Sequence, residues 1–439
     1  MKVLKFGGTS VGSAQRMKDV AKLITDGEQK IVVLSAMSGT TNTLVEISDY
    51  LYKKNPEGAN EIINKLEAKY KQHIDELYST EEYKQKTMEF VKSVFDYIRS
   101  YTKDIFTLFE EKVILAQGEI ISTNMVTNYL CEQGVDTVLI PALEFMRTDK
   151  NSEPDLNYIR EKLQSQLEAN PGKQIYITQG FICRNAYGEV DNLLRGGSDY
   201  TASLIGAAVN ASEIQIWTDI DGMHDNDPRI VDKTSPVRHL HFEEAAELAY
   251  FGAKILHPTC IQPAKYANIP VRLLNTMQPD APGTLISNDT EKGKIKAVAA
   301  KENITAIKIK SSRMLLAHGF LRKVFEIFES YQTPIDMVCT SEVGVSMSID
   351  NTKHLNEIVD DLKKYGTVTV DYDMCIICVV GDLEWENVGF EAKALDAMRD
   401  IPVRMISFGG SNYNISFLVR ESDKKRALQS LSDVLFNNK

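Results

Sequence analysis

The stretches VLKFGG at residues 3–8 and IVVLSAMSGTTN at residues 31–42 determine the fold that the sequence predicts. Each is a short apolar run followed by glycine or small polar residues, the pattern of a buried strand that ends in a turn. The same alternation of apolar strand and helical sequence returns at residues 138–140, 175–178 and 214–217. Buried strands that alternate with helices predict a three-layer α/β sandwich with a mostly parallel sheet.

The alternating pattern extends to about residue 290 with one interruption. Residues 57–116 are charged and carry apolar residues at helical spacing, so we expect a helical insertion there. A polar stretch at residues 287–294 predicts a linker. Beyond it, the order strand, helix, strand, strand, helix, strand fits a ferredoxin-like α+β unit, and a second copy from Cys375 lacks its last strand. The sequence therefore predicts one large α/β domain and two small C-terminal units.

The composition limits the classes of function. A formal net charge of −11 argues against binding to nucleic acid or to an acidic membrane. No apolar run approaches the roughly 20 residues that cross a bilayer, and the first residues lack the features of a secretion signal. The six cysteines show neither a disulfide framework nor zinc spacing, and we expect no metal site built from protein ligands alone. These features predict a soluble protein of the cytoplasm.

Two glycine-rich turns lie where phosphate could bind. Residues 7–14 contain the two spaced glycines of a P-loop but not the lysine that follows them there; instead Lys5 precedes the glycines, at the end of a predicted strand. In residues 193–203 two glycines open a predicted helix whose positive end favours anions. Arg195, just before them, supplies a planar group suited to a carboxylate. Both turns therefore predict an anion site at the carboxyl edge of the sheet.

Taken together, these motifs resemble the aspartokinases of the amino acid kinase family, and the likeness runs along essentially the whole chain. Several signatures in order are far more specific than any one of them. The matching segments are KFGGTSV at 5–11, LSA at 34–36, TTN at 40–42, GE at 118–119, TQGF at 178–181, RGGSDYT at 195–201, WTD at 217–219 and FGAK at 251–254.

The resemblance implies an ATP-dependent kinase, with Mg²⁺, that phosphorylates the β-carboxylate of L-aspartate in the first step of lysine, threonine and methionine biosynthesis. Lys5 would bridge that carboxylate and the phosphoryl group, and Asp199 would organise the centre. Glu119 would hold the substrate ammonium and Arg195 its α-carboxylate. The remaining substrate residues that it implies are Ser35, Thr41 and Phe181.

The nucleotide contacts that the resemblance implies include one departure from the family pattern, because His224 stands where a tyrosine is expected. They are Lys5, Phe6, Gly7, Gly8, Thr218, Asp219, His224, Arg229 and Lys254. The charges fit the reaction, since the acceptor carboxylate and the triphosphate repel each other and need local cations. One cation about 4 Å from a unit negative charge is worth roughly 4 kcal/mol at an effective dielectric constant near 20.

The C-terminal region resembles tandem ACT domains, with the first inserted into the second. The resemblance implies a catalytic domain at 1–290, a first ACT domain at 311–381, and a second formed by 301–310 and 382–439, which the strand near 304–310 completes. It implies at least a homodimer through these domains, with a tetramer left open. The residues that match a lysine pocket are Met314, Phe320, Leu321, Asp336, Ser341 and Glu342; Ala317 stands where serine is expected.

Two alternatives remain open at this point. Another enzyme of the fold, such as an N-acetylglutamate or carbamate kinase, would share the phosphate loops but is not expected to combine the RGGSDYT segment with two ACT units. A pseudokinase that only senses amino acids would be expected to lack Lys5 or Asp199, and both are present.

Overall fold

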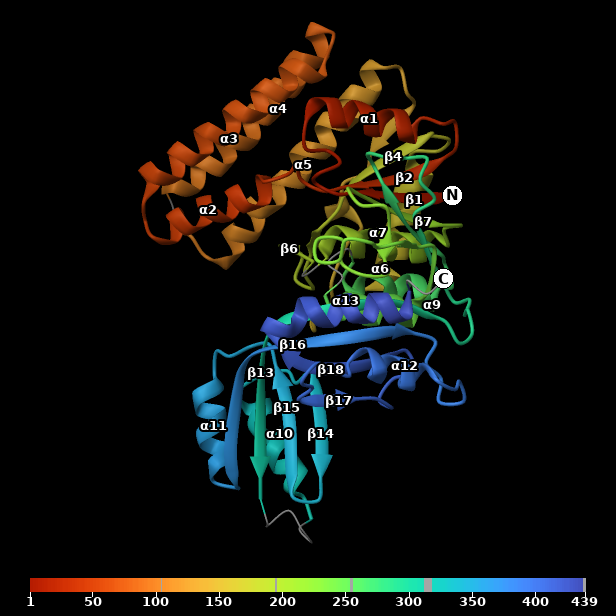
Figure 1. Cartoon of the computed structure of the whole chain (residues 1–439). Coiled ribbons are helices and arrows are strands. Elements are labelled where there is room, and N and C mark those ends of the chain that lie inside the picture. The colour runs from red at the N-terminus through yellow and green to blue at the C-terminus, as the bar shows by residue number, and fades with distance from the viewer. Residues whose placement is uncertain (104, 194–195, 253–255, 312–317, 437–439) are drawn as a thin grey trace. The chain divides into compact units, whose positions relative to one another are not determined.

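The computed structural model describes the whole chain except residues 104, 194–195, 253–255, 312–317 and 437–439. It divides into two compact units, Met1–Met223 with Ile255–Asn288 and His224–Lys254 with Asp289–Lys439 (Figure 1). Each unit has its own sheet and its own core, so each is described by itself.

The first unit is built on a sheet with the strand order β12-β11-β7-β1-β2-β4-β3. Neighbouring strands are parallel except β11 and β12, which are antiparallel. The strands are β1 (Lys2–Phe6), β2 (Lys30–Leu34), β3 (Thr137–Leu139), β4 (Ile175–Gln179), β7 (Ile214–Thr218), β11 (Val271–Asn275) and β12 (Thr284–Ser287), and a separate hairpin is formed by β5 (Ile182–Arg184) and β6 (Val190–Asn192).

Helices cover both faces of this sheet, with α1 and α5 on one face and α6 and α7 on the other (Figure 1). Every residue of β2 and β4 is buried, which explains why these strands read as continuous apolar runs rather than as alternating ones. The helices and short 3₁₀ turns of the unit are α1 (Ala14–Ile24), α2 (Thr40–Tyr52), α3 (Pro56–Leu77), α4 (Glu81–Ser100), η1 (Tyr101–Lys103), α5 (Leu108–Glu132), η2 (Ala142–Glu144), α6 (Leu156–Ala169), α7 (Gly197–Val209), η3 (Pro258–Ile261) and α9 (Gln262–Tyr266).

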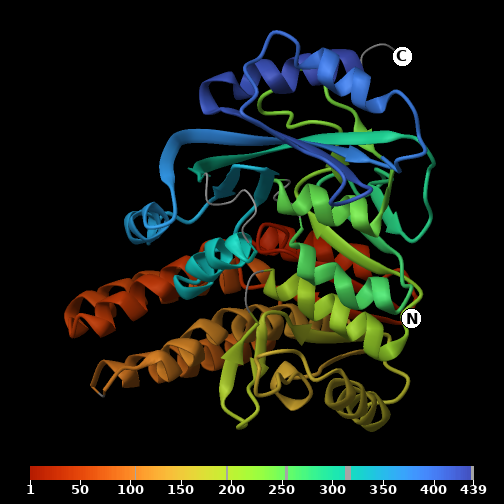
Figure 2. The same cartoon turned by 90° about the horizontal axis from the view of Figure 1, so that it is seen from below.

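Helices α3 and α4 lie side by side, next to α2 and α5 (Figures 1 and 2). Helix α3 begins with Pro56 after the N-cap Asn55, whose side chain accepts a hydrogen bond from the N–H of Gly58. Its buried side chains Ile63 and Tyr70 recur at helical spacing and pack into the core of the first unit. The chain then returns through α5, which passes back to the sheet.

The second unit is an antiparallel sheet with the strand order β14-β15-β13-β16-β18-β17 and helices packed against it. The short strand β8 (Met223–His224) lies where the chain passes from the first unit to the second. The elements of the second unit are β9 (Pro236–Val237), β10 (His239–His241), α8 (Phe242–Tyr250), β13 (Ile295–Lys310), α10 (Phe320–Ser330), β14 (Met337–Ser341), β15 (Gly344–Ile349), α11 (Leu355–Lys363), β16 (Thr367–Gly381), α12 (Phe390–Ala397), β17 (Met405–Ser407), β18 (Asn414–Arg420), η5 (Glu421–Asp423) and α13 (Lys424–Leu435).

Strands β13 and β16 are long and serve both halves of this sheet. Residues 304–310 of β13 pair with β15 and with the first half of β16, whereas residues 295–301 pair with residues 376–381 in the second half of β16. The strand that completes the second β-α-β-β-α set is therefore 295–301, not 304–310 as the sequence suggested. The predicted α/β class with a separate α+β region is confirmed.

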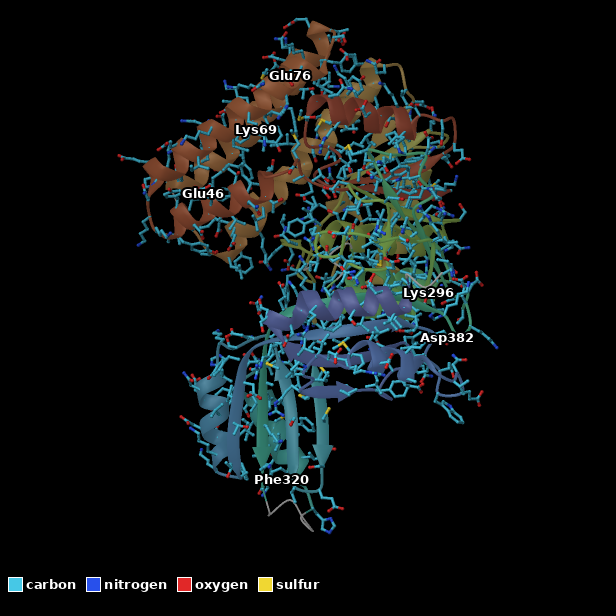
Figure 3. All side chains as sticks on the ribbon, viewed as in Figure 1. Glu46, Lys69, Glu76, Lys296, Phe320 and Asp382 are labelled. Carbon is cyan, nitrogen blue, oxygen red and sulfur yellow. The ribbon has the colours of Figure 1, made fainter. Side chains whose placement is uncertain are left out.

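The second unit has two apolar clusters, one under each pair of helices. One packs α10 and α11 against β13 and β15, and the other packs α12 and α13 against β16 and β18. Figure 3 labels Phe320, the buried first residue of α10, together with Lys296 and Asp382. Lys296 donates to the carbonyl of His239 at 3.0 Å, and Asp382 accepts a hydrogen bond from the N–H of Gly293 at 2.7 Å. These buried polar groups are therefore satisfied inside the unit.

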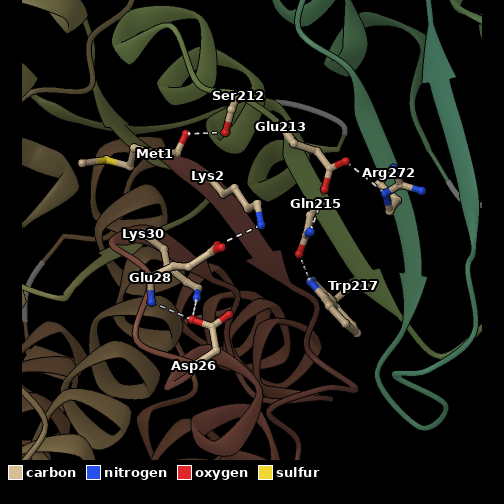
Figure 4. Close-up of polar contacts among 10 residues, drawn as sticks. All are labelled: Met1, Lys2, Asp26, Glu28, Lys30, Ser212, Glu213, Gln215, Trp217 and Arg272. Carbon is tan, nitrogen blue, oxygen red and sulfur yellow. Dashed lines mark hydrogen bonds and ion pairs between the residues drawn. The ribbon is translucent and has the colours of Figure 1, made fainter.

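Polar side chains fix the amino-terminal ends of the strands in the first unit (Figure 4). Lys2 of β1 forms an ion pair of 2.8 Å with Glu28, which precedes β2. Arg272 of β11 pairs with Glu213, which precedes β7, at 3.0 Å, and Gln215 donates to the same carboxylate at 2.7 Å. The candidate site lies at the opposite, carboxyl ends of the strands.

In the part of the chain that the structure describes, no helix has both the length and the apolar character that a membrane crossing requires.

Candidate active site

A cavity of about 380 Å³ lies at the carboxyl ends of β1, β2 and β4, against the start of α7. This is the edge at which open α/β sheets bind ligands. Five parts of the sequence meet there: the parallel strands bring their carboxyl ends to one side, and helix α5 adds Glu119. The lining residues are Lys5, Gly8, Ser35, Ala36, Met37, Ser38, Gly39, Thr41, Asn42, Glu119, Phe181, Gly196, Gly197, Ser198 and Asp199.

Lys5 and Asp199 form an ion pair inside this cavity. Lys5 is the penultimate residue of β1, and Asp199 lies in the first turn of α7. The Nζ and Oδ1 atoms are 2.7 Å apart, and the two side chains are only 11% and 14% exposed. The pair therefore holds a cation and an anion close together at a place that a small ligand can reach.

Glycines allow α7 to approach the end of β4 closely. A Cβ on Gly197 would lie 2.6 Å from the ring of Phe181, and one on Gly180 would lie 2.5 Å from Ser198. Phe181 has a φ of 69°, a strained value for a bulky residue and one that is concentrated at functional sites. Its N–H donates to the hydroxyl of Thr201 at 3.0 Å. The start of α7, with its positive helix end, is thus held directly against the cavity.

Glu119, on α5, is the buried acid of the cavity. It is 4% exposed, and its Oε1 accepts a hydrogen bond from the N–H of Ala36 at 3.1 Å. Its Oε2 is also buried and has no hydrogen-bond partner among the described residues. Burial raises the pKa of this carboxyl to about 8, although the bond from Ala36 acts in the opposite direction. An unpartnered buried carboxylate oxygen at a cavity is suited to a cationic group of a ligand.

The structure brings most of the predicted acceptor-site residues together. Lys5, Gly8, Ser35, Thr41, Glu119, Phe181 and Asp199 all line the cavity. Phe6 lies behind it, stacked on Trp217 with ring centroids 5.7 Å apart, and the N–H of Gly7 donates to the carbonyl of Trp217 at 3.3 Å. Arg195, Lys254 and Met314 lie outside the described residues.

The predicted nucleotide residues belong to both units. Thr218 ends β7, which pairs with β1, and the exposed Asp219 follows it, so both lie at the carboxyl edge of the sheet. In the second unit, Nδ1 of His224 lies 2.9 Å from the hydroxyl of Thr234. Arg229, also in that unit, is exposed and forms an ion pair of 2.7 Å with Asp227.

The predicted effector residues that the structure describes lie around α10 and β14. Phe320 is buried, Leu321 is 37% exposed, and Ser341 and Glu342 are exposed at the end of β14. Asp336, just before β14, has a side chain that is only 1% exposed, and it forms an ion pair of 2.7 Å with Lys301.

Sequence reasoning missed part of the cavity wall. Met37, Ser38 and Gly39 line the cavity but lie between the two segments that carried the resemblance, LSA and TTN. Their position in one short loop between those segments is the signal that could have found them. Among the described residues there is no group of three or more His, Cys, Asp or Glu side chains that could hold a metal ion.

Comparison with known proteins places this site in a family. The amino acid kinase family matches residues 1–275, and the ACT domain matches residues 377–435. The chain belongs to the amino acid kinase family. Within it the chain is an aspartokinase-type member, because aspartokinase 1 of Arabidopsis thaliana is 35% identical to it, a match that covers 99% of this chain and 80% of the relative.

Solved structures of E. coli aspartokinase III agree with that assignment. The complex with aspartate and ADP, described as the R-state, is 30% identical with a TM-score of 0.85, and the match covers 99% of this chain and 100% of the other. The complex with lysine and aspartate, described as the T-state, is 31% identical with a TM-score of 0.81 and covers 99% of each chain. The predicted membership of the aspartokinases, the kinase fold and the presence of ACT sequence are confirmed.

Proposed function

We propose that the chain transfers the γ-phosphoryl group of ATP to the β-carboxylate of L-aspartate in the cavity lined by Lys5, Glu119 and Asp199. One observation carries the proposal: the same cavity holds a buried carboxylate with an unpartnered oxygen and, at a second place, a lysine in an ion pair. A substrate with an ammonium at one end and a carboxylate at the other would contact both.

Glu119 would bind the ammonium of aspartate. Its free Oε2 gains a charge-assisted hydrogen bond when the substrate enters, which removes an unsatisfied buried group at the same time. Thr41 and Phe181 line the same cavity and would contact the rest of the substrate. Arg195 would bind the α-carboxylate, as the sequence resemblance implies.

Lys5 would act at the other end of the substrate. In phosphoryl transfer the protein mainly positions two negatively charged reactants and stabilises the charge of the transition state. Lys5 and the first residues of α7 line the same cavity, so the Nζ of Lys5 and the positive end of that helix would lie beside the β-carboxylate and the transferred group. The reaction needs no base, because the acceptor carboxylate is already ionised at neutral pH.

ATP would carry Mg²⁺ into this site. Mg²⁺ is commonly bound through one or two carboxylates together with the phosphates of the nucleotide, so a dedicated cluster of protein ligands is not required. Asp199 lines the cavity beside Lys5 and is a carboxylate of this kind. The metal would neutralise phosphate charge, and the chain's own contribution is the position of Asp199 and Lys5. The E. coli relative with aspartate and ADP supports ATP as the donor.

The reaction is tested by trapping the acyl phosphate with hydroxylamine as a hydroxamate. With ATP, Mg²⁺ and L-aspartate we expect a signal that depends on both substrates, and none with N-acetyl-L-glutamate in place of aspartate. A signal with N-acetyl-L-glutamate and none with aspartate would instead support the related kinase of the same fold.

Feedback inhibition by lysine is the second part of the proposal. The E. coli relative with lysine and aspartate supports a lysine effector, and Phe320, Leu321, Asp336, Ser341 and Glu342 are the described residues that would surround it. Lysine added to the hydroxamate assay should inhibit, and threonine should not. Glu342→Gln changes an exposed acid and should weaken inhibition by lysine without changing the turnover measured in the absence of lysine. Equal inhibition of the parent chain and of Glu342→Gln would exclude Glu342 from the effector site.

We also propose that the second unit mediates a homodimer. Its two outermost strands expose apolar side chains, Val338 on β14 and Ile406 on β17, and Phe408 follows β17. Sγ of Cys339 on β14 donates to the carbonyl of Ile406 on β17 at 3.1 Å, so the two strands touch, and the exposed apolar side chains beside them form a surface that proteins normally cover. Sedimentation velocity should show a dimer for the full chain, and Val338→Glu should shift it toward the monomer; a monomeric parent chain would contradict the proposal.

A further inference from the structure

One face of the loop formed by residues 35–42 builds the cavity, and the other face touches the helical insertion. We call residues 35–42 the acceptor loop; they include the first three residues of α2. All of its residues line the cavity except Thr40, which is 1% exposed and lies on the far side of the loop. The hydroxyl of Thr40 lies 2.9 Å from the hydroxyl of Tyr70, which comes from α3. The loop is therefore bonded directly to a helix that contributes nothing to the lining.

A second contact comes from the preceding residue of the same helix. Nζ of Lys69, which Figure 3 labels on α3, donates to the carbonyl of Ser38 at 3.2 Å. On its other side the loop is held by the glycine-rich turn, where the N–H of Ser38 donates to the carbonyl of Gly8 at 3.1 Å. The acceptor loop is thus held between the first strand of the sheet and the insertion.

The acceptor loop also packs against α5 next to Glu119, the buried acid of the site. A Cβ on Gly118 would lie 2.8 Å from Cβ of Ala36 and 3.3 Å from Cγ2 of Thr40, so α5 packs tightly against the loop one residue before Glu119. Ala36 in turn donates its N–H to Glu119. A shift of Thr40 would therefore move the group that fixes the Glu119 carboxylate.

We infer that Tyr70 is a positioning residue for the acceptor pocket and that the α3–α4 insertion holds the acceptor loop in its substrate-binding position. Tyr70 is 1% exposed, and burial raises its pKa, so the hydroxyl keeps its proton and can donate to Thr40. Because Tyr70 does not line the cavity, it acts through the loop. The inference takes the identity of the substrate from the proposed function. The contact between Tyr70 and Thr40 does not depend on that function.

Tyr70→Phe is the first test, since it removes the hydroxyl and leaves the buried ring. The loop contacts the substrate in the ground state and the transition state alike, so the loss should appear in KM for aspartate and not in kcat. We expect that KM to rise about 3- to 10-fold, the range that one net hydrogen bond supplies, with KM for ATP unchanged.

Tyr78→Phe is the matched control. Tyr78 is also buried next to α3, and its hydroxyl donates to the carbonyl of Met125 at 2.7 Å, away from the acceptor loop. Both variants should lower the melting temperature, but only Tyr70→Phe should raise KM for aspartate. Equal KM values in the two variants would overturn the inference, because a merely structural tyrosine predicts that result.

A double-mutant cycle tests the partner of the hydroxyl. Thr40→Val removes the other half of the bond, so the double variant with Tyr70→Phe should raise KM no more than one single variant does, whereas Thr40→Ser should keep the parent value. Additive effects would contradict the contact. Lys69→Met should raise KM for aspartate by about 2-fold at most, since its bond to Ser38 is exposed. Lys65→Met is its control, because Lys65 pairs with the exposed Glu61 at 2.6 Å and not with the acceptor loop.

Hydrogen exchange separates this inference from the proposed function. The amides of residues 35–42 should exchange faster in Tyr70→Phe than in Tyr78→Phe, whatever substrate the protein uses. Absence of aspartate turnover in the parent chain would reject the proposed function and leave this readout intact. Unchanged exchange of the loop in Tyr70→Phe would reject the positioning role even if the parent chain phosphorylates aspartate.

Discussion

Two lysine–aspartate pairs, one in each unit, have the same separation and very different surroundings. Lys5 and Asp199 lie 2.7 Å apart beside a cavity, and a strained residue and several glycines surround them. Lys301 and Asp336 also lie 2.7 Å apart, but Asp350 approaches the same ammonium at 3.0 Å. Separation alone therefore does not distinguish a reactive pair from a structural one.

The second pair is enclosed by its neighbours. The hydroxyl of Tyr250 lies 3.0 Å from Asp336, and the ring of Tyr250 lies 4.5 Å from the ammonium of Lys301. Burial lowers the pKa of Lys301, but its bonds to Asp336 and Asp350 outweigh burial and raise it overall. Two acids and an aromatic face already surround this lysine. The first pair borders a cavity that a ligand can enter, and this difference assigns phosphoryl-transfer chemistry to Lys5 and stability of the second unit to Lys301.

The largest expected effect is on turnover. Lys5→Met should lower kcat by about 10³-fold, because loss of roughly 4 kcal/mol of charge stabilisation corresponds to that factor. Lys301→Met should leave uninhibited kcat within about 2-fold, since it lies outside the cavity. Both values come from the hydroxamate assay on folded protein. A large loss of kcat in both variants would break the comparison.

The next largest effect is on stability, and here Lys301→Met should have the larger effect and Lys5→Met the smaller one. Lys301→Met leaves the buried carboxyl of Asp336 without its main partner, so the free energy of unfolding of the second unit should fall by about 3 kcal/mol. Lys5→Met should change the stability of the first unit by about 1 kcal/mol or less, because its pair faces an open cavity. Urea unfolding followed by circular dichroism measures both, and equal losses would show that Lys5 is also structural.

The smallest expected effect is the pH dependence of KM for aspartate, which tests the role of Glu119 in the first site. With a pKa of about 8, Glu119 is mostly protonated at pH 7, and it must lose its proton to bind an ammonium. KM for aspartate should therefore rise as the pH falls below about 8, toward tenfold per pH unit, and level off above it. The pH profile of KM in the parent chain and in Glu119→Gln measures this dependence. The variant should bind aspartate weakly and show no such slope; a parental slope in Glu119→Gln would assign the titration to another group.

The sequence predicted the features that depend on local pattern. The buried strands, the glycine turns and the positions of Lys5 and Asp199 at strand and helix ends all follow from short-range periodicity and turn chemistry. Their convergence on one cavity follows from the parallel sheet, because its carboxyl ends lie together.

Contacts between distant side chains could not be predicted in this way. Tyr70 occupies the apolar stripe of α3 like any core residue, and nothing in the spacing shows that its hydroxyl meets Thr40, 30 residues away. The long strands were missed for another reason. The polar residues near 303 and 373 suggest chain breaks, but Asn303 and Asp373 adopt positive φ values of 59° and 53°, and the strands continue across the resulting irregularity.

A crystal structure of the full chain with L-aspartate tests the central claim most directly. The account predicts aspartate in the cavity at the carboxyl ends of β1, β2 and β4, with its ammonium in hydrogen-bond contact with Oε2 of Glu119 and its β-carboxylate next to Nζ of Lys5. Aspartate bound in the reverse orientation, or at another place with this cavity empty, would contradict it.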